Sequence, residues 1–223
     1  MHTVSIPDFI LEANQRRRGR VHALERIDPR RTALLVIDMQ HAWLEPGFSM
    51  LEIPAARTIV DNINRIAAAL RDAGGTVAFT QHAWGDWPEF YDMFTRPGFR
   101  EDVIPKTAPG TPGHELWKGI RAEPGDLRVV KNRPSAFIQG SSDLDARLRA
   151  RGIDTLIITG TLTNACCEAS ARDAAALNYK VIFVGDATAT RSDVEHNAAL
   201  INVMQFVADL WMTDELIGLI GRG

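Results

Sequence analysis

Three side chains that could form a catalytic cysteine site stand at the ends of separate apolar segments. Asp38 follows the run LLVI, Lys131 closes the run RVVK, and Cys166 comes shortly after the run TLIITG. A thiol becomes a good nucleophile near neutral pH when a base and a positive charge lie beside it. Each residue alone has a structural interpretation, as a turn residue, a solvated lysine or a small buried side chain. Together they indicate catalysis by Cys166, with Asp38 as the base and Lys131 as the positive neighbour.

The chain holds two cysteines, and they are adjacent: Cys166 and Cys167. Neighbouring cysteines make a strained disulfide that joins no distant segments, so we expect free thiols. One residue turns an α-helix by about 100°, and Cys167 must therefore point away from Cys166. We interpret Cys167 as a packing residue on the inner face of the helix, with a redox role as the alternative.

Apolar segments alternate with helical patterns along most of the chain. Buried strands are predicted at residues 32–39, 76–83, 126–131, 154–160 and 180–188, with an edge strand in DLWMT. Helices are predicted at 55–73, from Ser142 through Arg151, over the cysteine segment, and from the capping box of Ser192 and Glu195 to about residue 208. Such alternation predicts a three-layer α/β/α sandwich with a mainly parallel sheet. Ligands then bind beyond the carboxyl ends of the strands.

Composition limits the class of protein. A chain of 223 residues, 45% hydrophobic and 24% charged, favours one domain over 1–223, with an N-terminal arm at about 1–30. A net charge of -3 argues against a nucleic-acid partner, and the arginine run at 16–20 is interpreted as a solvated helix or arm. No apolar stretch approaches the ~20 residues that span a bilayer, so we expect no membrane partner and a cytoplasmic location.

Three segments in order resemble the isochorismatase-like cysteine hydrolase family. They are DMQ at 38–40, KxxxSAF at 131–137 and GxxTNxCxExSARDA at 160–174. The resemblance implies a Rossmann-like α/β/α fold with Asp38, Lys131 and Cys166 as the catalytic triad. It also implies a cis peptide between Thr161 and Leu162, and an oxyanion hole made by the backbone N–H groups of Leu162 and Cys166.

The resemblance further implies an amidohydrolase with no cofactor, which cleaves a small amide, ureide, carbamoyl compound or lactam through a thioester. Family members that use a metal carry an Asp and His cluster after the second strand, whereas here His82, Asp86 and Glu89 stand in a different arrangement. We therefore expect no metal. The side chains expected to line the substrate pocket are Gln40, Trp43, His82, Trp84, Trp87 and Phe137.

Other interpretations remain open at this stage. The family also includes vinyl-ether hydrolases of the isochorismatase type, which dispense with the cysteine, and a doubly wound fold can serve as a non-catalytic ligand-binding module. The long segment after Trp84 is rich in aromatic residues that either line the pocket or fill the core. Its apolar surface and the N-terminal arm favour a homo-oligomer, a dimer or a tetramer.

Overall fold

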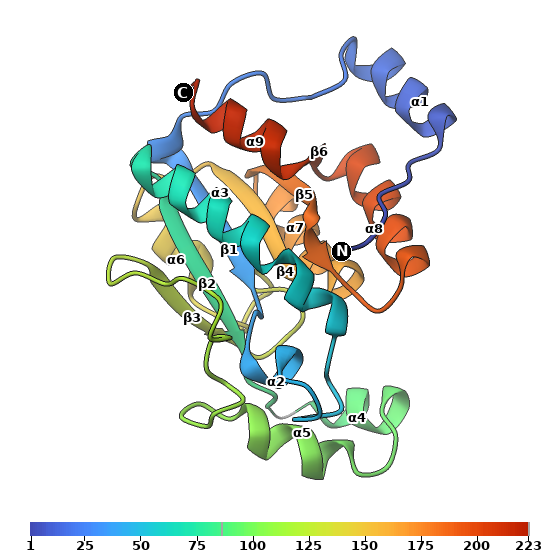
Figure 1. Cartoon of the computed structure of the whole chain (residues 1–223), viewed down its shortest axis with the longest axis vertical. Coiled ribbons are helices and arrows are strands. Elements are labelled where there is room, and N and C mark those ends of the chain that lie inside the picture. The colour runs from blue at the N-terminus through green and yellow to red at the C-terminus, as the bar shows by residue number, and fades with distance from the viewer. Residues whose placement is uncertain (86, 223) are drawn as a thin grey trace.

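A single parallel sheet organises the protein. The computed structural model describes residues 1–85 and 87–222, and its six strands lie in the order β3-β2-β1-β4-β5-β6 with every neighbouring pair parallel (Figure 1). The strands are β1 Thr32–Ile37, β2 Thr76–His82, β3 Leu127–Lys131, β4 Thr155–Thr161, β5 Lys180–Ala189 and β6 Asp209–Trp211. Every residue of the central strand β1 is buried, as its continuous apolar run requires.

Helices cover both faces of the sheet. α3 (Val60–Asp72) and α9 (Thr213–Ile220) pack on one face, and α6 (Leu144–Arg149), α7 (Glu168–Ala176) and α8 (Asp193–Phe206) pack on the other (Figure 1). Each face has its own core of buried aliphatic side chains. The predicted three-layer sandwich is confirmed. Among the described residues, no helix combines the length and the apolar character that crossing a bilayer requires.

Several element boundaries differ from the sequence-based predictions. The helix predicted from residue 55 begins as a 3-10 turn at Pro54–Ile59, and the helix predicted from Ser142 through Arg151 is shorter at both ends, as α6 spans Leu144–Arg149. Ser192 is confirmed as the N-cap of α8, since its hydroxyl accepts from the Glu195 N–H at 3.2 Å; the Glu195 carboxylate accepts from the same hydroxyl at 2.8 Å, where a full capping box would use the Ser192 N–H. α9 was not predicted, although its buried residues Leu216, Leu219 and Ile220 recur at helical spacing.

The segment after Trp84, expected to be irregular, contains two short helices. α4 (Pro88–Phe94) and α5 (Phe99–Thr107) lie with α2 (His41–Leu44) beyond the carboxyl ends of the central strands (Figure 1). Pro105 lies inside α5 and Gly98 caps it in a left-handed conformation, so α5 shows no clear apolar period in the sequence. These helices supply part of the wall of the cavity described below.

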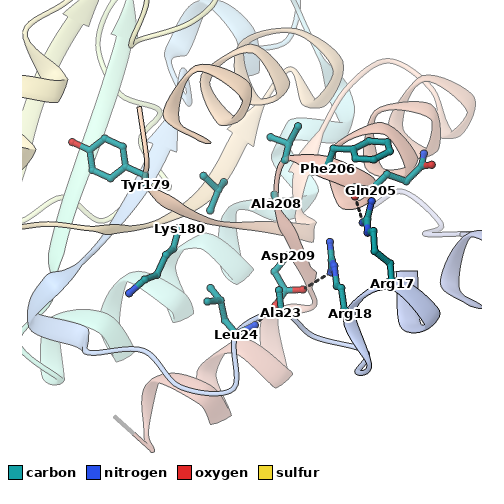
Figure 2. Close-up of a pocket in the computed structure, with 12 residues that line it drawn as sticks. Arg17, Arg18, Ala23, Leu24, Tyr179, Lys180, Gln205, Phe206, Ala208 and Asp209 are labelled. Carbon is teal, nitrogen blue, oxygen red and sulfur yellow. Dashed lines mark hydrogen bonds and ion pairs between the residues drawn. The ribbon is translucent and has the colours of Figure 1, made fainter. Parts of the chain in front are cut away.

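The N-terminal arm packs against the end of α8. It contains α1 (Asp8–Arg18), whose Arg17 donates to the Gln205 carbonyl, while Arg18 lies 3.2 Å from the Asp209 carboxylate (Figure 2). The Arg18 side chain is only 17% exposed, so the expectation of a solvated arginine run is wrong for this residue. The acid that binds it lies 191 positions further along the chain, where a local charge count does not reach.

Candidate active site

Asp38 follows directly on β1 and is held on both its backbone and its side chain. Its N–H donates to the Thr80 carbonyl at 3.1 Å, and the Thr80 hydroxyl donates to Oδ1 at 3.0 Å. The φ angle of Asp38 is 53°, in the left-handed region that aspartate tolerates better than most residues. This turn ends the strand and leaves the second carboxylate oxygen facing Lys131.

The ammonium of Lys131 is the centre of the site. Nζ lies 2.7 Å from Asp38 Oδ2, 2.8 Å from His82 Nδ1 and 3.4 Å from Cys166 Sγ, and it donates to the Arg133 carbonyl at 3.1 Å. Lys131 and Asp38 are both fully buried. A buried charge is stable only with a partner and further hydrogen bonds, and this cluster supplies both. The structure thus brings Asp38, Lys131 and Cys166 together from three separate strand ends.

The two cysteines lie in different surroundings. They end one π-helical turn, Thr163–Cys167, that leads into α7. Cys166 is partly exposed and faces Lys131, whereas Cys167 is fully buried, with its sulfur 3.8 Å from the Thr159 carbonyl. A π-helical turn inside a helix often marks a functional site. The position of Cys167 supports its interpretation as a packing residue.

The backbone before Cys166 makes a tight bend. The peptide bond between Thr161 and Leu162 is cis, and the Leu162 carbonyl accepts from the N–H groups of Ala165 and Cys167 at 3.1 Å each. Gly160 has a φ of 107°, and a Cβ there would lie 2.1 Å from the Ile37 carbonyl oxygen. Only glycine therefore lets β4 approach the end of β1 this closely. In sequence, the N–H of Cys166 stands between the N–H groups of Ala165 and Cys167, which both donate to the Leu162 carbonyl.

Burial sets the ionisation of the site. It raises the pKa of the Cys166 thiol to about 12, against the opposing charge of Lys131. Burial also raises the pKa of Asp38 and outweighs the effect of Lys131 on that carboxyl. Both shifts favour the protonated form, so the Cys166 thiol is neutral near neutral pH.

A cavity of about 550 Å³ opens onto Cys166. Three of the expected pocket residues, Trp43, His82 and Trp84, line it. Arg96 and Arg191 are the fully charged side chains among the lining residues that the structure describes, and sequence reasoning missed both. The other described lining residues are Met50, Leu51, Phe90, Phe94, Thr95, Phe99, Pro134, Leu162 and Ala165. Four aromatic residues of the segment after β2, Trp84, Phe90, Phe94 and Phe99, thus belong to the site wall.

Three expected pocket residues lie elsewhere. Gln40 is fully buried, and its amide bonds to the backbone of His82 and His114 instead of facing the cavity. Phe137 packs in the core beside Tyr179, with ring centroids 5.7 Å apart. Trp87 lies beneath the guanidinium of Arg133 in a separate surface hollow. Sequence position placed these residues near the site but could not give the direction of their side chains.

The residues considered as a metal cluster do not all converge. Glu89 is exposed on α4, and Asp86 lies outside the described residues. Within the described chain, the donor atoms that do converge belong to Asp38, His82 and Cys166, all within 4.8 Å of one another. The Lys131 ammonium lies among these three atoms, at 2.7 to 3.4 Å. Lys131 thus supplies a positive charge where such a donor set would otherwise favour a metal ion.

Comparison with known sequences agrees with this geometry. The Isochorismatase domain model matches residues 32–215. Ureidoacrylate amidohydrolase RutB of Caulobacter vibrioides is 33% identical over 216 residues, which cover 88% of this chain and 94% of that protein. RutB of Klebsiella pneumoniae is 32% identical over 206 residues, covering 83% of this chain and 84% of that protein.

Solved structures show the same fold. A cysteine hydrolase from Pseudomonas syringae pv. phaseolicola matches with a TM-score of 0.78 and 30% identity, over 88% of this chain and 95% of that one. N-carbamoylsarcosine amidase from Thermoplasma acidophilum matches with a TM-score of 0.68 and 26% identity, over 82% and 97% of the two chains. The sequence match over 32–215 and these relatives show that the chain belongs to the isochorismatase family.

Proposed function

We propose that this protein hydrolyses the C–N bond of a small amide or ureide, with Cys166 as the nucleophile. One observation carries the proposal: the Lys131 ammonium lies 2.7 Å from the Asp38 carboxylate and 3.4 Å from the sulfur of Cys166, a residue that lines the cavity. Base, positive charge and thiol are thus in contact, as nucleophilic catalysis requires. The amidohydrolase names of the relatives support C–N cleavage.

The first half-reaction forms a thioester. Asp38 accepts the proton of the Cys166 thiol, and the sulfur attacks the substrate carbonyl carbon while the carbonyl electrons move to oxygen. The N–H groups of Leu162 and Cys166 are the proposed donors to this oxyanion, and Lys131 stabilises the negative charge on the sulfur and the carboxylate. Asp38 then returns the proton to the nitrogen, the C–N bond breaks, and ammonia or an amine leaves.

The second half-reaction restores the thiol. Water attacks the thioester carbonyl and gives up a proton to Asp38, so the same carboxylate acts as base twice. Collapse of the tetrahedral intermediate breaks the C–S bond, and the proton on Asp38 passes to the Cys166 sulfur. The product is a carboxylic acid from an amide, or a carbamic acid from a ureide.

We expect the substrate to carry an acidic group. Arg96 and Arg191 bring positive charge to a cavity wall whose described residues include no carboxylate. Ureidoacrylate and N-carbamoylsarcosine, in the names of the relatives, are both carboxylates. Both arginines are exposed, so their effect is moderate, and we expect kcat/KM about tenfold higher for an N-carbamoyl amino acid than for its neutral amide. Ammonia release from the two compounds, at low and high salt, measures this preference.

The control is a distant exposed arginine. Arg191→Gln should remove most of the preference for the anion while leaving the rate on the neutral amide nearly unchanged. Arg151→Gln, in the turn that follows α6, should leave both rates unchanged. Equal kcat/KM for the charged and neutral compounds in the unaltered protein would contradict the assignment of an acidic substrate.

We also propose that the protein is a homo-oligomer and works in the cytoplasm. Large apolar side chains are exposed on α1, α4 and α8, including Phe9, Phe94 and Phe206, which a monomer rarely leaves in water. Both cysteines are free, which suits a reducing compartment. Light scattering at micromolar concentration is expected to give a dimer or tetramer, and a monomeric mass would refute the oligomer.

A further inference from the structure

His82 makes close contact with the catalytic cluster but takes no part in the steps above. It ends β2 and is 1% exposed, and its Nδ1 atom lies 2.8 Å from Lys131 Nζ. On the other side of the ring, His82 lines the cavity beside Trp84, with ring centroids 4.6 Å apart. The imidazole therefore contacts the ammonium and also belongs to the cavity wall.

The contact with Lys131 fixes the tautomer of His82. A lysine ammonium has three hydrogens to donate and no lone pair, so Nδ1 must accept and the proton of a neutral ring must sit on Nε2. Burial, followed by the charges of Lys131 and Arg133, lowers the pKa of His82 well below its usual value and keeps the ring neutral. Nε2 is buried and has no hydrogen-bond partner among the described residues.

The backbone around His82 is held in place. Gln40 Oε1 accepts from the His82 N–H at 2.6 Å, and Gln40 Nε2 donates to the His82 carbonyl at 3.1 Å. The same amide also donates to the His114 carbonyl at 3.1 Å. Since this amide is completely buried, the end of β2 has little freedom and the imidazole keeps one position.

The ammonium of Lys131 is held by several partners. It donates to His82 Nδ1 at 2.8 Å, to the Arg133 carbonyl at 3.1 Å and to the Cys166 sulfur at 3.4 Å, and it forms an ion pair with Asp38 Oδ2 at 2.7 Å. We propose that His82 is a positioning residue that holds the charged ammonium of Lys131 between Asp38 and Cys166 by accepting one of its hydrogens at Nδ1. The inference rests on the proposed role of Cys166 as the nucleophile.

Loss of this acceptor should lower the reactivity of the thiol. The buried ammonium would keep the Arg133 carbonyl, the Cys166 sulfur and the Asp38 carboxylate but lose one acceptor, so the charged form of Lys131 becomes less favourable relative to the neutral form. Its proton then passes to Asp38, the nearest base, and the site loses both its positive charge and its proton acceptor. The Cys166 thiolate would then form only at higher pH.

The test compares two variants of His82. Asparagine can place an amide oxygen where Nδ1 stood, whereas leucine has a similar size and no acceptor. For each variant, the rate of Cys166 alkylation by iodoacetamide is measured against pH, with kcat and KM on an active amide. His114→Leu is the matched control, because His114 is also a buried neutral histidine but has no contact with Lys131.

We expect His82→Leu to raise the pH of half-maximal alkylation and to lower kcat about tenfold or more, and His82→Asn to restore most of the lost rate. His114→Leu should leave the alkylation midpoint unchanged. Equal impairment by asparagine and leucine, or an unshifted midpoint in His82→Leu, would overturn the proposal. Should His82→Leu fail to fold, the ¹⁵N NMR spectrum of the unaltered protein decides, since a proton on Nδ1 of His82 excludes the proposed hydrogen bond.

Alkylation needs no substrate, so this test is separate from that of the proposed function. If no amide is hydrolysed but the midpoint shifts only in His82→Leu, the positioning role stands and the proposed reaction fails. If amides are hydrolysed and the midpoint does not shift, the proposed reaction stands and the role of His82 is refuted.

Discussion

Replacement of Cys166 by alanine is expected to abolish hydrolysis without unfolding the protein. In the proposed mechanism the sulfur forms the covalent bond to the substrate carbon, and no described side chain nearby offers a second thiol, since Cys167 is buried in the core. Loss of a nucleophile of this kind lowers kcat by about 10⁴-fold or more. Cys166 is partly exposed, so the loss of one sulfur atom there costs little stability. Ammonia release and thermal unfolding measure the two effects.

Cys167 provides the matched control. Cys167→Val keeps an apolar side chain of similar size in the core and should retain substantial activity. Iodoacetamide should label Cys166 first, which peptide mapping after limited alkylation can show. If Cys167 is labelled first and its loss stops turnover, the nucleophile is Cys167 and the assignment to Cys166 is wrong. If neither loss matters, the cysteine mechanism fails, and vinyl-ether hydrolysis or a non-catalytic ligand-binding role becomes the better interpretation.

Asp38→Asn is expected to lower kcat by about 10³-fold or more, since the amide cannot accept the thiol proton and leaves the buried Lys131 charge without its partner. The raised pKa of Asp38 gives a second expectation. The base works only when ionised, so kcat/KM should fall as the pH falls through a value above the ordinary range of an aspartate. A pH profile of kcat/KM in the unaltered protein measures this acid limb.

Asp126 is a suitable control for the loss of a buried ion pair. It pairs with Arg71 at 2.6 Å, where β3 begins, at the opposite end of the sheet from Lys131. Asp126→Asn should lower stability and leave kcat and the acid limb unchanged. If instead Asp38→Asn and Asp126→Asn lower kcat equally, Asp38 supports the fold and is not the base.

The order of the elements and the identity of the triad could be predicted from the sequence. Continuous apolar runs such as residues 34–37 have no stable place outside a sheet covered on both faces, and helices between them force the strands to be parallel. Parallel strands put their carboxyl ends at one edge, so Asp38, Lys131 and Cys166 had to meet there. The family motifs around the same residues led to the same assignment.

The residues that line the cavity could not be predicted from local sequence patterns. Gln40, Trp87 and Phe137 are near the triad in sequence, yet each points away from the cavity because of what it packs against. Conversely, Arg96 and Arg191 come from segments far from the motifs and reach the cavity through the fold of α4, α5 and the turn after β5. Side-chain direction depends on neighbours that are distant in the sequence, and no spacing rule contains them.

The ionisation of the site was also decided by the tertiary structure. A sequence assigns Asp38, His82 and Cys166 their ordinary pKa values, but desolvation around one ammonium raises that of the thiol to about 12 and lowers that of the imidazole. Desolvation depends on every group that excludes water from the site, and hydrogen bonding depends on distances of a few tenths of an ångström. The sequence therefore determined which groups meet, and the packed structure determined which of them holds the proton.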